Sequence, residues 1–486
     1  MKMRPKIWMI GYFVIVAGML SIIGGQVVKV DPFFHYHRPN TELYYYPLDN
    51  QRNVNDGIVR HFEYDALITG SSMTENFKAT EMDAIFGVHS VKVPFSGGSY
   101  KEVNDMLARA LKCDPDLATV VRSLDMNYFF NTKDVMREDL GEYPTYLYDD
   151  NVINDVKYIF NRDIIFNRVY SMLRENDAPG FVPGILAFDE YCYWSFLYPY
   201  GTNLASRSAI VSEGPVEPVH ITEEEKEIIH GNIEQNVTSL AREYPDVDFY
   251  YFFPPYSAAW WEVKVADGTI YKQIEAEECI IEQILQCGNI KLFSFNNRTD
   301  ITTDINHYRD NDHYGSWINS LMLKWMHDGQ YILTEENYKD YLWQELSFYT
   351  TYDYSLLYEQ ADYENDLLAE ALLREELTGV EPLGLLPECE PKDAGMEVVV
   401  EEIGPYGYLV FESEEDVWAD VHIYDENQEE TAVPMVDGYE AYDIQHQYIW
   451  DVSRLTGRAT IVYNGIYMDA AQAGNASDAF CDITLY

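Results

Sequence analysis

A chain of 486 residues, 47% of them hydrophobic and 15% aromatic, is long enough for two or three domains with a large packed core, which excludes a disordered chain. Its 82 acidic and 33 basic residues give a formal net charge of -49, and a field of that sign repels nucleic-acid phosphates. We therefore expect no nucleic-acid partner and interpret most of the carboxylates as a solvated surface.

The N-terminus has the pattern of a membrane anchor. Lys2, Arg4 and Lys6 precede an uncharged stretch over residues 7–28, which as a helix covers about 33 Å and exceeds the roughly 30 Å hydrocarbon layer. Basic residues before a span favour a cytoplasmic start. A cleaved signal peptide is the alternative, but its apolar core is shorter and ends at a small-residue cleavage site. The sequence predicts a cytoplasmic tip and single transmembrane helix over residues 1–29, in a cell membrane, with the bulk of the chain extracytoplasmic.

Short apolar runs alternate with helical patterns between residues 60 and 330. Helices are expected at 72–86, 100–111 and 270–286. Strands are expected at 65–69, 90–94, 118–124, 246–253 and 290–295. This alternation, with right-handed crossovers, predicts an α/β fold: a flavodoxin-like three-layer α/β/α sandwich with a parallel sheet.

Other segments depart from that alternation. Amphipathic helical pieces predict a helical insertion at about 131–245, and an acidic helical segment is expected at 334–377. Pro, Gly and charged residues mark a boundary before residue 393, and the alternating pattern beyond it predicts a small β-sandwich at 393–486. The α/β domain would then occupy residues 30–385.

The six cysteines include no C-x-x-C motif, so no structural metal site is expected. Cys389 and Cys481 bracket the C-terminal segment. A disulfide between them and burial as small apolar side chains are both open.

The first strand ends in Gly70, Ser71 and Ser72, where a helix is expected to begin. In a parallel sheet this junction lies at the carboxyl edge, where ligands bind, and helix N-terminal N–H groups can stabilise an oxyanion. Ser72 is therefore a candidate nucleophile, although a serine that merely caps a helix fits the same local pattern.

A second group of polar residues follows the fifth strand. Asp310 precedes His313 by three residues, so its carboxylate can reach Nδ1 and leave Nε2 free to take a serine proton. Asp304 and His307 have the same spacing, and this loop, which also contains Asp312, could instead hold a metal ion.

These motifs, in this order, resemble those of the SGNH (GDSL-like) hydrolase superfamily over roughly residues 60–330. The first family motif, Gly-Asp-Ser-Leu, looks like Gly-Ser-Ser-Met at 70–73, with Ser in place of Asp. The last, Asp-x-x-His, matches residues 310–313, where a Gly-Ser and a helix follow as in the family. The resemblance implies a catalytic domain with the triad Ser72, His313 and Asp310, and no cofactor or metal.

The family's oxyanion hole adds a glycine and an asparagine to the nucleophile's N–H. The glycine motif resembles PFSGGS at 94–99, which points to Gly97. The third strand ends in SLDMN, which lacks the family's Gly-x-Asn-Asp; Asn127 is the better amide donor and Asp125 the alternative. The expected oxyanion hole is therefore Ser72, Gly97 and Asn127.

The fourth strand ends in FPPYSAAWW at 253–261. Pro255, Tyr256 and Trp260 are expected at the same edge, where exposed aromatic rings could stack on a sugar or hold an acyl chain. Packing of these aromatic residues beside a proline-stiffened loop is the alternative.

An ordinary α/β-hydrolase is disfavoured because G-x-S-x-G is absent around Ser72. Membrane-tethered SGNH proteins include the D-alanyl transfer protein of teichoic acid and polysaccharide O-acetyltransferases. The resemblance therefore implies an esterase or acyltransferase that acts on acyl esters of cell-envelope or exported glycans, with a membrane-bound O-acyltransferase as a possible partner. Hydrolysis and transfer remain open. The alternatives are a catalytically inactive SGNH-fold surface protein that binds glycan and, less favoured, a generic lipase.

Overall fold

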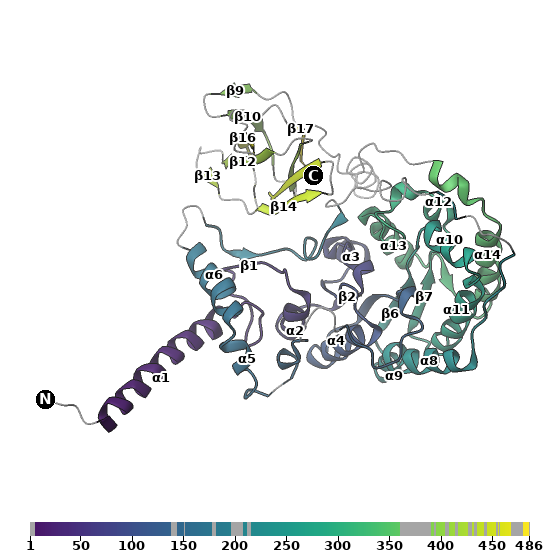
Figure 1. Cartoon of the computed structure of the whole chain (residues 1–486), viewed down its shortest axis with the longest axis horizontal. Coiled ribbons are helices and arrows are strands. Elements are labelled where there is room, and N and C mark those ends of the chain that lie inside the picture. The colour runs from purple at the N-terminus through teal and green to yellow at the C-terminus, as the bar shows by residue number, and fades with distance from the viewer. Residues whose placement is uncertain are drawn as a thin grey trace. The chain divides into compact units, whose positions relative to one another are not determined.

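The computed structural model of the chain forms two compact units (Figure 1). The larger unit comprises Met1–Asn176, Pro183–Tyr193 and Leu204–Ala361, and the second contains Asp362–Tyr486 with two short earlier segments. The residues that the structure describes are 5–137, 143–149, 151–176, 181–195, 208–210, 215–359, 390–392, 395–403, 408–413, 417–425, 430–431, 435–441, 445–452, 455, 457–467 and 480–485.

A six-stranded sheet with the order β3-β2-β4-β6-β7-β8 organises the larger unit. Five strands are parallel, and β8 at the edge is antiparallel to β7. Residues of β2 and β3 are buried throughout, as in sheets covered on both faces. The five predicted strands are confirmed to within two residues at each end, and only the short β8 was missed. The strands are β2 (Ala66–Gly70), β3 (Ser90–Pro94), β4 (Thr119–Ser123), β6 (Asp248–Phe253), β7 (Ile290–Ser294) and β8 (Ile332–Leu333).

Helices cover both faces of this sheet (Figure 1). Neighbouring residues of β6 point to opposite faces. Phe252 packs against Phe77, which precedes α3, whereas Tyr251 lies against Arg122, whose guanidinium donates to the carbonyl of Tyr100 at the start of α4. The principal helices are α2 (Gln51–His61), α3 (Ala79–Phe86), α4 (Tyr100–Cys113), α8 (Glu223–Ile233), α9 (Ser239–Glu243), α10 (Ala258–Ala266), α11 (Ile270–Ile284), α13 (Ser316–His327) and α14 (Tyr338–Thr351).

The single helix predicted over residues 72–86 is wrong. Ser72–Thr74 forms a short 3-10 helix, η1, and α3 begins only at Ala79. The cause is Lys92, a fully buried residue of β3, whose ammonium donates to the carbonyl of Glu75 at 2.5 Å and to that of Phe77 at 2.9 Å. These bonds satisfy carbonyls that a continuous helix would have paired with its own N–H groups.

The predicted insertion at 131–245 also differs. Its last part, α8 and α9 with the intervening π-helical segment η6 (Glu234–Thr238), packs on α4 and α11 and is the crossover from β4 to β6. Thr222 starts α8 with a capping box that uses Glu225. Before it, the described residues form short elements: the 3-10 helix η3 (Thr145–Leu147), α5 (Val156–Ile159), the π-helical η4 (Ile164–Val169), α6 (Tyr170–Glu175) and β5 (Gly184–Ile185), which pairs with β1 (Tyr45–Tyr46).

The predicted acidic helical segment at 334–377 is partly described. It contains α14 and a short 3-10 helix, η8 (Tyr354–Glu359); residues 360–377 lie outside the described part.

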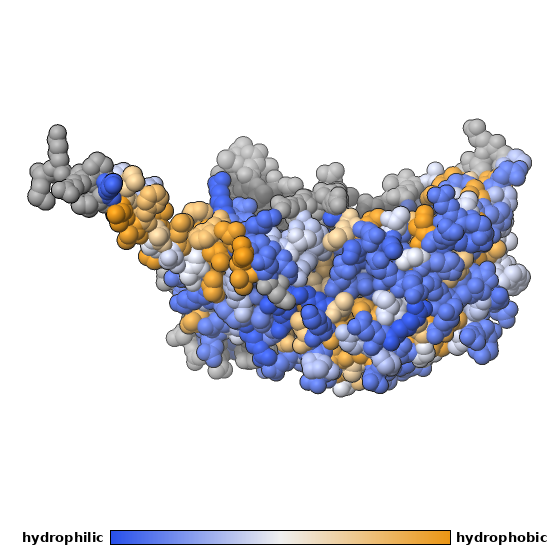
Figure 2. Space-filling view, turned by 90° about the horizontal axis from the view of Figure 1, so that it is seen from below, coloured by the Kyte–Doolittle hydropathy of each residue, from blue (hydrophilic) through white to orange (hydrophobic). Residues whose placement is uncertain are grey.

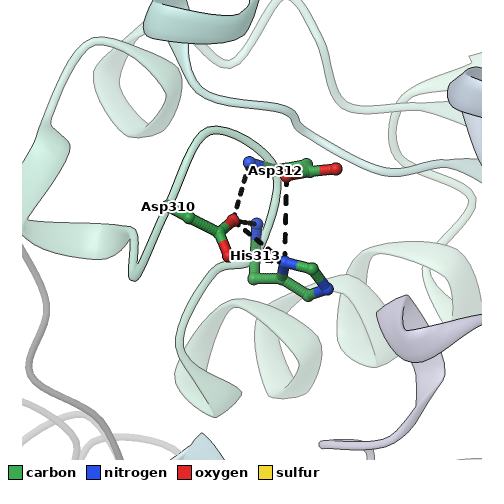
Figure 3. A group of neighbouring side chains, drawn as sticks. All are labelled: Asp310, Asp312 and His313. Atoms are coloured by element: carbon green, nitrogen blue, oxygen red, sulfur yellow. Dashed lines mark hydrogen bonds and ion pairs between the residues drawn. The ribbon is translucent and has the colours of Figure 1, made fainter. Parts of the chain in front are cut away.

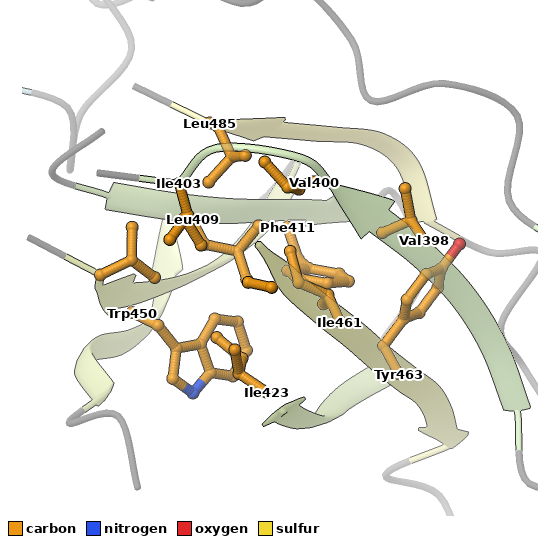
Figure 4. Close-up of a cluster of buried hydrophobic side chains, with 12 residues drawn as sticks. Val398, Val400, Ile403, Leu409, Phe411, Ile423, Trp450, Ile461, Tyr463 and Leu485 are labelled. Carbon is orange, nitrogen blue, oxygen red and sulfur yellow. The ribbon is translucent and has the colours of Figure 1, made fainter. Parts of the chain in front are cut away.

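Two antiparallel sheets make up the described part of the second unit, in the orders β13-β12-β16-β10-β9 and β14-β15-β11-β17. Side chains from both sheets share one hydrophobic core, in which Phe411 contacts Trp450 and Tyr463 (Figure 4). The strands are β9 (Glu390–Lys392), β10 (Gly395–Val400), β11 (Tyr408–Ser413), β12 (Val417–Tyr424), β13 (Glu430–Thr431), β14 (Met435–Ala441), β15 (Gln445–Asp451), β16 (Ala459–Tyr467) and β17 (Phe480–Leu485).

The predicted boundary at 385–393 and the proposed Cys389–Cys481 pair cannot be compared with this unit. Residues 381–389 lie outside the described residues, as does the side chain of Cys481.

The N-terminal helix α1 (Pro5–Val30) contains an apolar stretch, Trp8–Val30, that is long enough to cross a membrane. Most of this helix is exposed, but Val27 and Val30 are fully buried where its last turns pack on α5 and η4. The helix is therefore consistent with single-pass anchoring of the larger unit.

Replacement of Lys92 by Met should destabilise the larger unit. The variant keeps most of the buried volume but removes the donor to three backbone carbonyls, those of Glu75, Phe77 and Asp189. We expect a loss of about 1–3 kcal/mol in the free energy of unfolding, measured by urea denaturation. The matched control is Lys339→Met, because the side chain of Lys339 is 66% exposed; there we expect a change within about 0.5 kcal/mol. Equal stability of the two variants would contradict this account.

Candidate active site

The structure brings the predicted serine and histidine together. Ser72 Oγ lies 2.9 Å from His313 Nε2, although the two residues are 241 positions apart in the chain. Ser72 follows β2 directly in η1, and His313 lies in the loop that leaves β7 and leads to α13. Both loops leave carboxyl ends of parallel strands, which meet at one edge of the sheet.

Asp310 orients this histidine (Figure 3). Both of its carboxylate oxygens lie 2.9 Å from His313 Nδ1, and Oδ1 also accepts the backbone N–H groups of Asp312 at 3.1 Å and His313 at 2.9 Å. An ionised carboxylate there requires a hydrogen on Nδ1, which leaves the Nε2 lone pair directed at Ser72. Burial raises the pKa of Asp310, but its hydrogen bonds and the charge of His313 outweigh burial and lower it, so the carboxylate stays ionised.

A second carboxylate lies beside the imidazole. Asp312 Oδ1 is 3.8 Å from His313 Nδ1. Burial and the negative charges of Asp310 and Asp125 raise the pKa of Asp312 to about 7, despite the opposing effect of His313. Burial lowers the pKa of His313, but the hydrogen bond and charge of Asp310, together with the charge of Asp312, raise it above its ordinary value. The histidine and its two carboxylates therefore titrate as a coupled set.

The alternative pair, Asp304 and His307, has other partners. His307 Nδ1 accepts a hydrogen bond from the indole N–H of Trp317 at 3.1 Å, and its Nε2 lies 3.8 Å from Asp304. Burial lowers the pKa of His307. It is His313, and not His307, that contacts Ser72.

A metal ion would compete with the hydrogen bonds of the triad. Ligand atoms of Asp310, Asp312 and His313 lie within 4.8 Å of one another, close enough to hold a metal ion. However, Asp310 already occupies Nδ1 of His313, and Ser72 lies at Nε2. The hydrogen bonds therefore favour a catalytic triad over a metal centre.

Two backbone N–H groups are available as oxyanion donors. Within the described residues, those of Ser72 and Gly97 have no hydrogen-bond acceptor. Gly97 has a φ of 57°, a left-handed conformation that favours glycine, and a Cβ there would collide with the guanidinium of Arg137. Arg137 itself donates to the carbonyl of Ser96 at 3.0 Å.

The amide of Asn127 is not free to donate to an oxyanion. Its Nδ2 donates to Asp312 Oδ2 at 2.8 Å and to the Tyr256 hydroxyl at 3.2 Å, while its Oδ1 accepts the indole N–H of Trp260 at 3.1 Å. Both amide hydrogens therefore have acceptors, and a role for Asn127 in the oxyanion hole requires one of these bonds to break.

Asp125, the alternative to Asn127, is a buried acceptor. It accepts the Ser71 hydroxyl at 2.9 Å, the Asn127 N–H at 3.0 Å and the Tyr256 hydroxyl. Burial raises its pKa, although these hydrogen bonds oppose that effect. Ser71, which stands where the SGNH motif has Asp, thus binds a carboxylate from the end of β4.

The expectation that Tyr256 and Trp260 are exposed is wrong. Tyr256 is fully buried and Trp260 is 7% exposed, because their polar groups are bound to Asp125 and Asn127. Pro255 is also buried, and its carbonyl accepts the hydroxyl of Tyr308 at 2.6 Å. These residues support the site from below its surface and offer no stacking platform.

Sequence reasoning considered Asp312 only as part of a possible metal site and gave it no role beside the imidazole. The feature that could have indicated this role is the position of Asp312 directly before His313, in a loop that already contributes a carboxylate and an imidazole. Its contact with Asn127, 185 residues away, leaves no local trace in the sequence.

No family model, no curated protein and no solved structure matches this chain. A serine hydroxyl, a histidine with the correct free nitrogen, an ionised aspartate and two backbone donors are the groups that acyl transfer through a serine ester requires.

Proposed function

We propose that this chain is a serine esterase or acyltransferase of the SGNH type that acts through an acyl-enzyme. The 2.9 Å contact of Ser72 Oγ with His313 Nε2, with Asp310 on the opposite ring nitrogen, carries the proposal. The five parallel strands support it, since numbered along the chain their order in the sheet is 2-1-3-4-5, the flavodoxin-like order.

The reaction proceeds in two steps. The hydroxyl proton of Ser72 passes to His313 Nε2 while Oγ bonds to the ester carbonyl carbon, and the N–H groups of Ser72 and Gly97 stabilise the oxyanion. Collapse breaks the bond to the leaving alcohol, which takes the proton from His313. Water or a sugar hydroxyl then gives its proton to His313 and attacks the acyl carbon; the acyl–Oγ bond breaks, and His313 returns the proton to Ser72 Oγ. Asp310 stabilises the imidazolium in both steps.

The substrates we propose are acyl esters of cell-envelope or exported glycans. The support is the anchor-like α1, with Lys2, Arg4 and Lys6 before it, which favours a cytoplasmic N-terminus and an extracytoplasmic body. Membrane-tethered SGNH proteins of similar layout act on teichoic acids or exported polysaccharides, and by that analogy a membrane-bound O-acyltransferase is the proposed partner.

One observation favours a second candidate, a catalytically inactive SGNH-fold protein that binds glycan. Because the amide of Asn127 is held by Asp312 and Tyr256, the oxyanion position has only backbone donors. The two candidates differ in whether Ser72 is a nucleophile, which can be measured directly.

Full-length protein should react with a fluorophosphonate probe and turn over p-nitrophenyl acetate. Ser72→Ala should abolish labelling, because it removes the nucleophile. His313→Ala should reduce turnover by about 10³-fold or more, and Asp310→Asn by about 10²- to 10⁴-fold, because each disrupts the proton path. Labelling is read by in-gel fluorescence and turnover by absorbance.

The matched control is His307→Ala, which removes the other histidine with the same Asp-x-x-His spacing and should keep near-wild-type labelling. Absence of labelling in the wild-type protein would favour the glycan-binding candidate. Loss of labelling in His307→Ala with retention in His313→Ala would reverse the assignment of the base.

The pH dependence follows from the charges around His313. The base must be neutral, and its pKa is raised, so kcat/KM should increase with pH through an apparent pKa above about 6.5. Asp312→Asn removes a negative charge that stabilises the imidazolium and should move this midpoint to lower pH. Asp328→Asn, which removes a carboxylate after the end of α13, should leave it unchanged. An upward shift in Asp312→Asn would refute this electrostatic account.

A further inference from the structure

The end of α1 is fixed to the body of the larger unit by direct packing. Val27 and Val30 are fully buried, and Gly24 allows close approach: a Cβ there would lie 2.9 Å from Ile159 and 3.6 Å from Phe160. The last turns of α1 are therefore packed on the body and not joined to it by a flexible linker. Its packing on α5 and η4 fixes which surface of the body lies next to the helix.

The position of Gly24 along the helix gives the depth of this contact. Gly24 follows Ile7 by 17 residues, which corresponds to about 26 Å along the axis. The hydrocarbon layer is about 30 Å thick. If Ile7 lies at the cytoplasmic edge of the hydrocarbon layer, Gly24 is still inside that layer, near its opposite edge. A tilt of the helix shortens its span along the bilayer normal and moves Gly24 further from that opposite edge. Phe160, which contacts this position, then lies at the boundary between lipid tails and headgroups.

Exposed apolar side chains lie on the elements that make this contact and next to them. They are large side chains of α5, η4, α6 and the turn before α5. Figure 2 shows hydrophobic surface where the helix meets the body, in contrast to the largely hydrophilic remainder of that view. We call this surface the collar; its residues are Val152, Ile153, Val156, Phe160, Phe166 and Tyr170.

The charge of the same segment differs from that of the chain. Between Val152 and Arg174 there are four basic and two acidic residues, whereas the whole chain has 33 basic and 82 acidic. One of the two acidic residues, Asp155, is buried against His35, and one of the four basic residues, Arg168, is paired with Asp49. A locally basic, apolar surface suits a bilayer interface with anionic lipid, where apolar side chains enter the acyl boundary and basic groups meet headgroups.

We propose that the collar is a membrane-binding surface, so that the body is seated on the bilayer around α1 and is not merely tethered to it. The occupant is the lipid bilayer, because the surface is continuous with a helix long and apolar enough to cross one. This inference requires α1 to span the membrane but is independent of any chemistry at Ser72.

The test uses a fluorophore attached to the full-length chain, which is placed in nanodiscs that contain anionic lipid, one copy per disc. The measurement is how strongly this fluorophore is quenched from the lipid and from the aqueous phase. Phe166→Cys carries the label in a Cys113→Ser background, since Cys113 is exposed. The nitroxide of doxyl-labelled lipids should quench this label strongly and aqueous iodide only weakly. The matched control is Trp343→Cys on α14, because Trp343 is 68% exposed and Phe166 is 60% exposed; its label should show the reverse pattern.

A label at Phe13→Cys reports separately whether α1 is in the bilayer, and the Cys113→Ser protein without an added cysteine provides the blank. Lipid quenching at position 13 together with iodide quenching at 166 as strong as at 343 would overturn the inference. Protection at 166 that appears only with several copies per disc would also overturn it, since the occupant would be a second chain. Fluorophosphonate labelling of the same samples tests Ser72 independently.

Discussion

The Asp310 carboxylate is the interaction on which the proposed chemistry depends. It binds the imidazole of His313 and two backbone N–H groups of its own loop, so the loop conformation and the ring orientation are set by one group. Because these hydrogen bonds favour the ionised form, the lowered pKa of Asp310 and the direction of His313 Nε2 have the same cause. The 2.9 Å contact with Ser72 follows once β2 and β7 bring both loops to one edge of the sheet.

Three carboxylates lie around this imidazole, and their pKa values are shifted in different directions. Asp310 has a lowered pKa, whereas burial raises those of Asp125 and Asp312. Asp310 therefore stays ionised and orients the imidazole of His313, whereas the charge of Asp312 changes near neutral pH. Since Asp312 also holds the amide of Asn127, the charge on the base and the availability of a third oxyanion donor are coupled through one side chain.

The mostly parallel sheet was predictable because apolar strands that alternate with helices have a local sequence pattern, and the Asp-x-x-His spacing of Asp310 and His313 is also visible locally. The break between η1 and α3 was not predictable, because it depends on Lys92, a charged residue within an apolar strand that binds the carbonyls of Glu75 and Phe77, 17 and 15 positions away. The aromatic residues after β6 were misjudged for the same reason. Whether Tyr256 and Trp260 face solvent depends on Asp125 and Asn127, about 130 residues earlier in the chain.

Strand β3 connects the two backbone donors of the site. Gly70 at the end of β2 pairs with Pro94 at the end of β3, and the N–H of Phe95 donates to the carbonyl of Gly70 at 2.8 Å. Ser72 and Gly97 each follow within three residues of this pair. The same β3 contributes Lys92, which holds the turn after Ser72. The proposed nucleophile, Ser72, and the proposed second oxyanion donor, Gly97, are thus positioned from one strand pair, so a shift of β3 against β2 would move both N–H groups relative to the serine oxygen. The proposed oxyanion site of two backbone donors consequently depends on the register of this pair more than on any side chain at the surface.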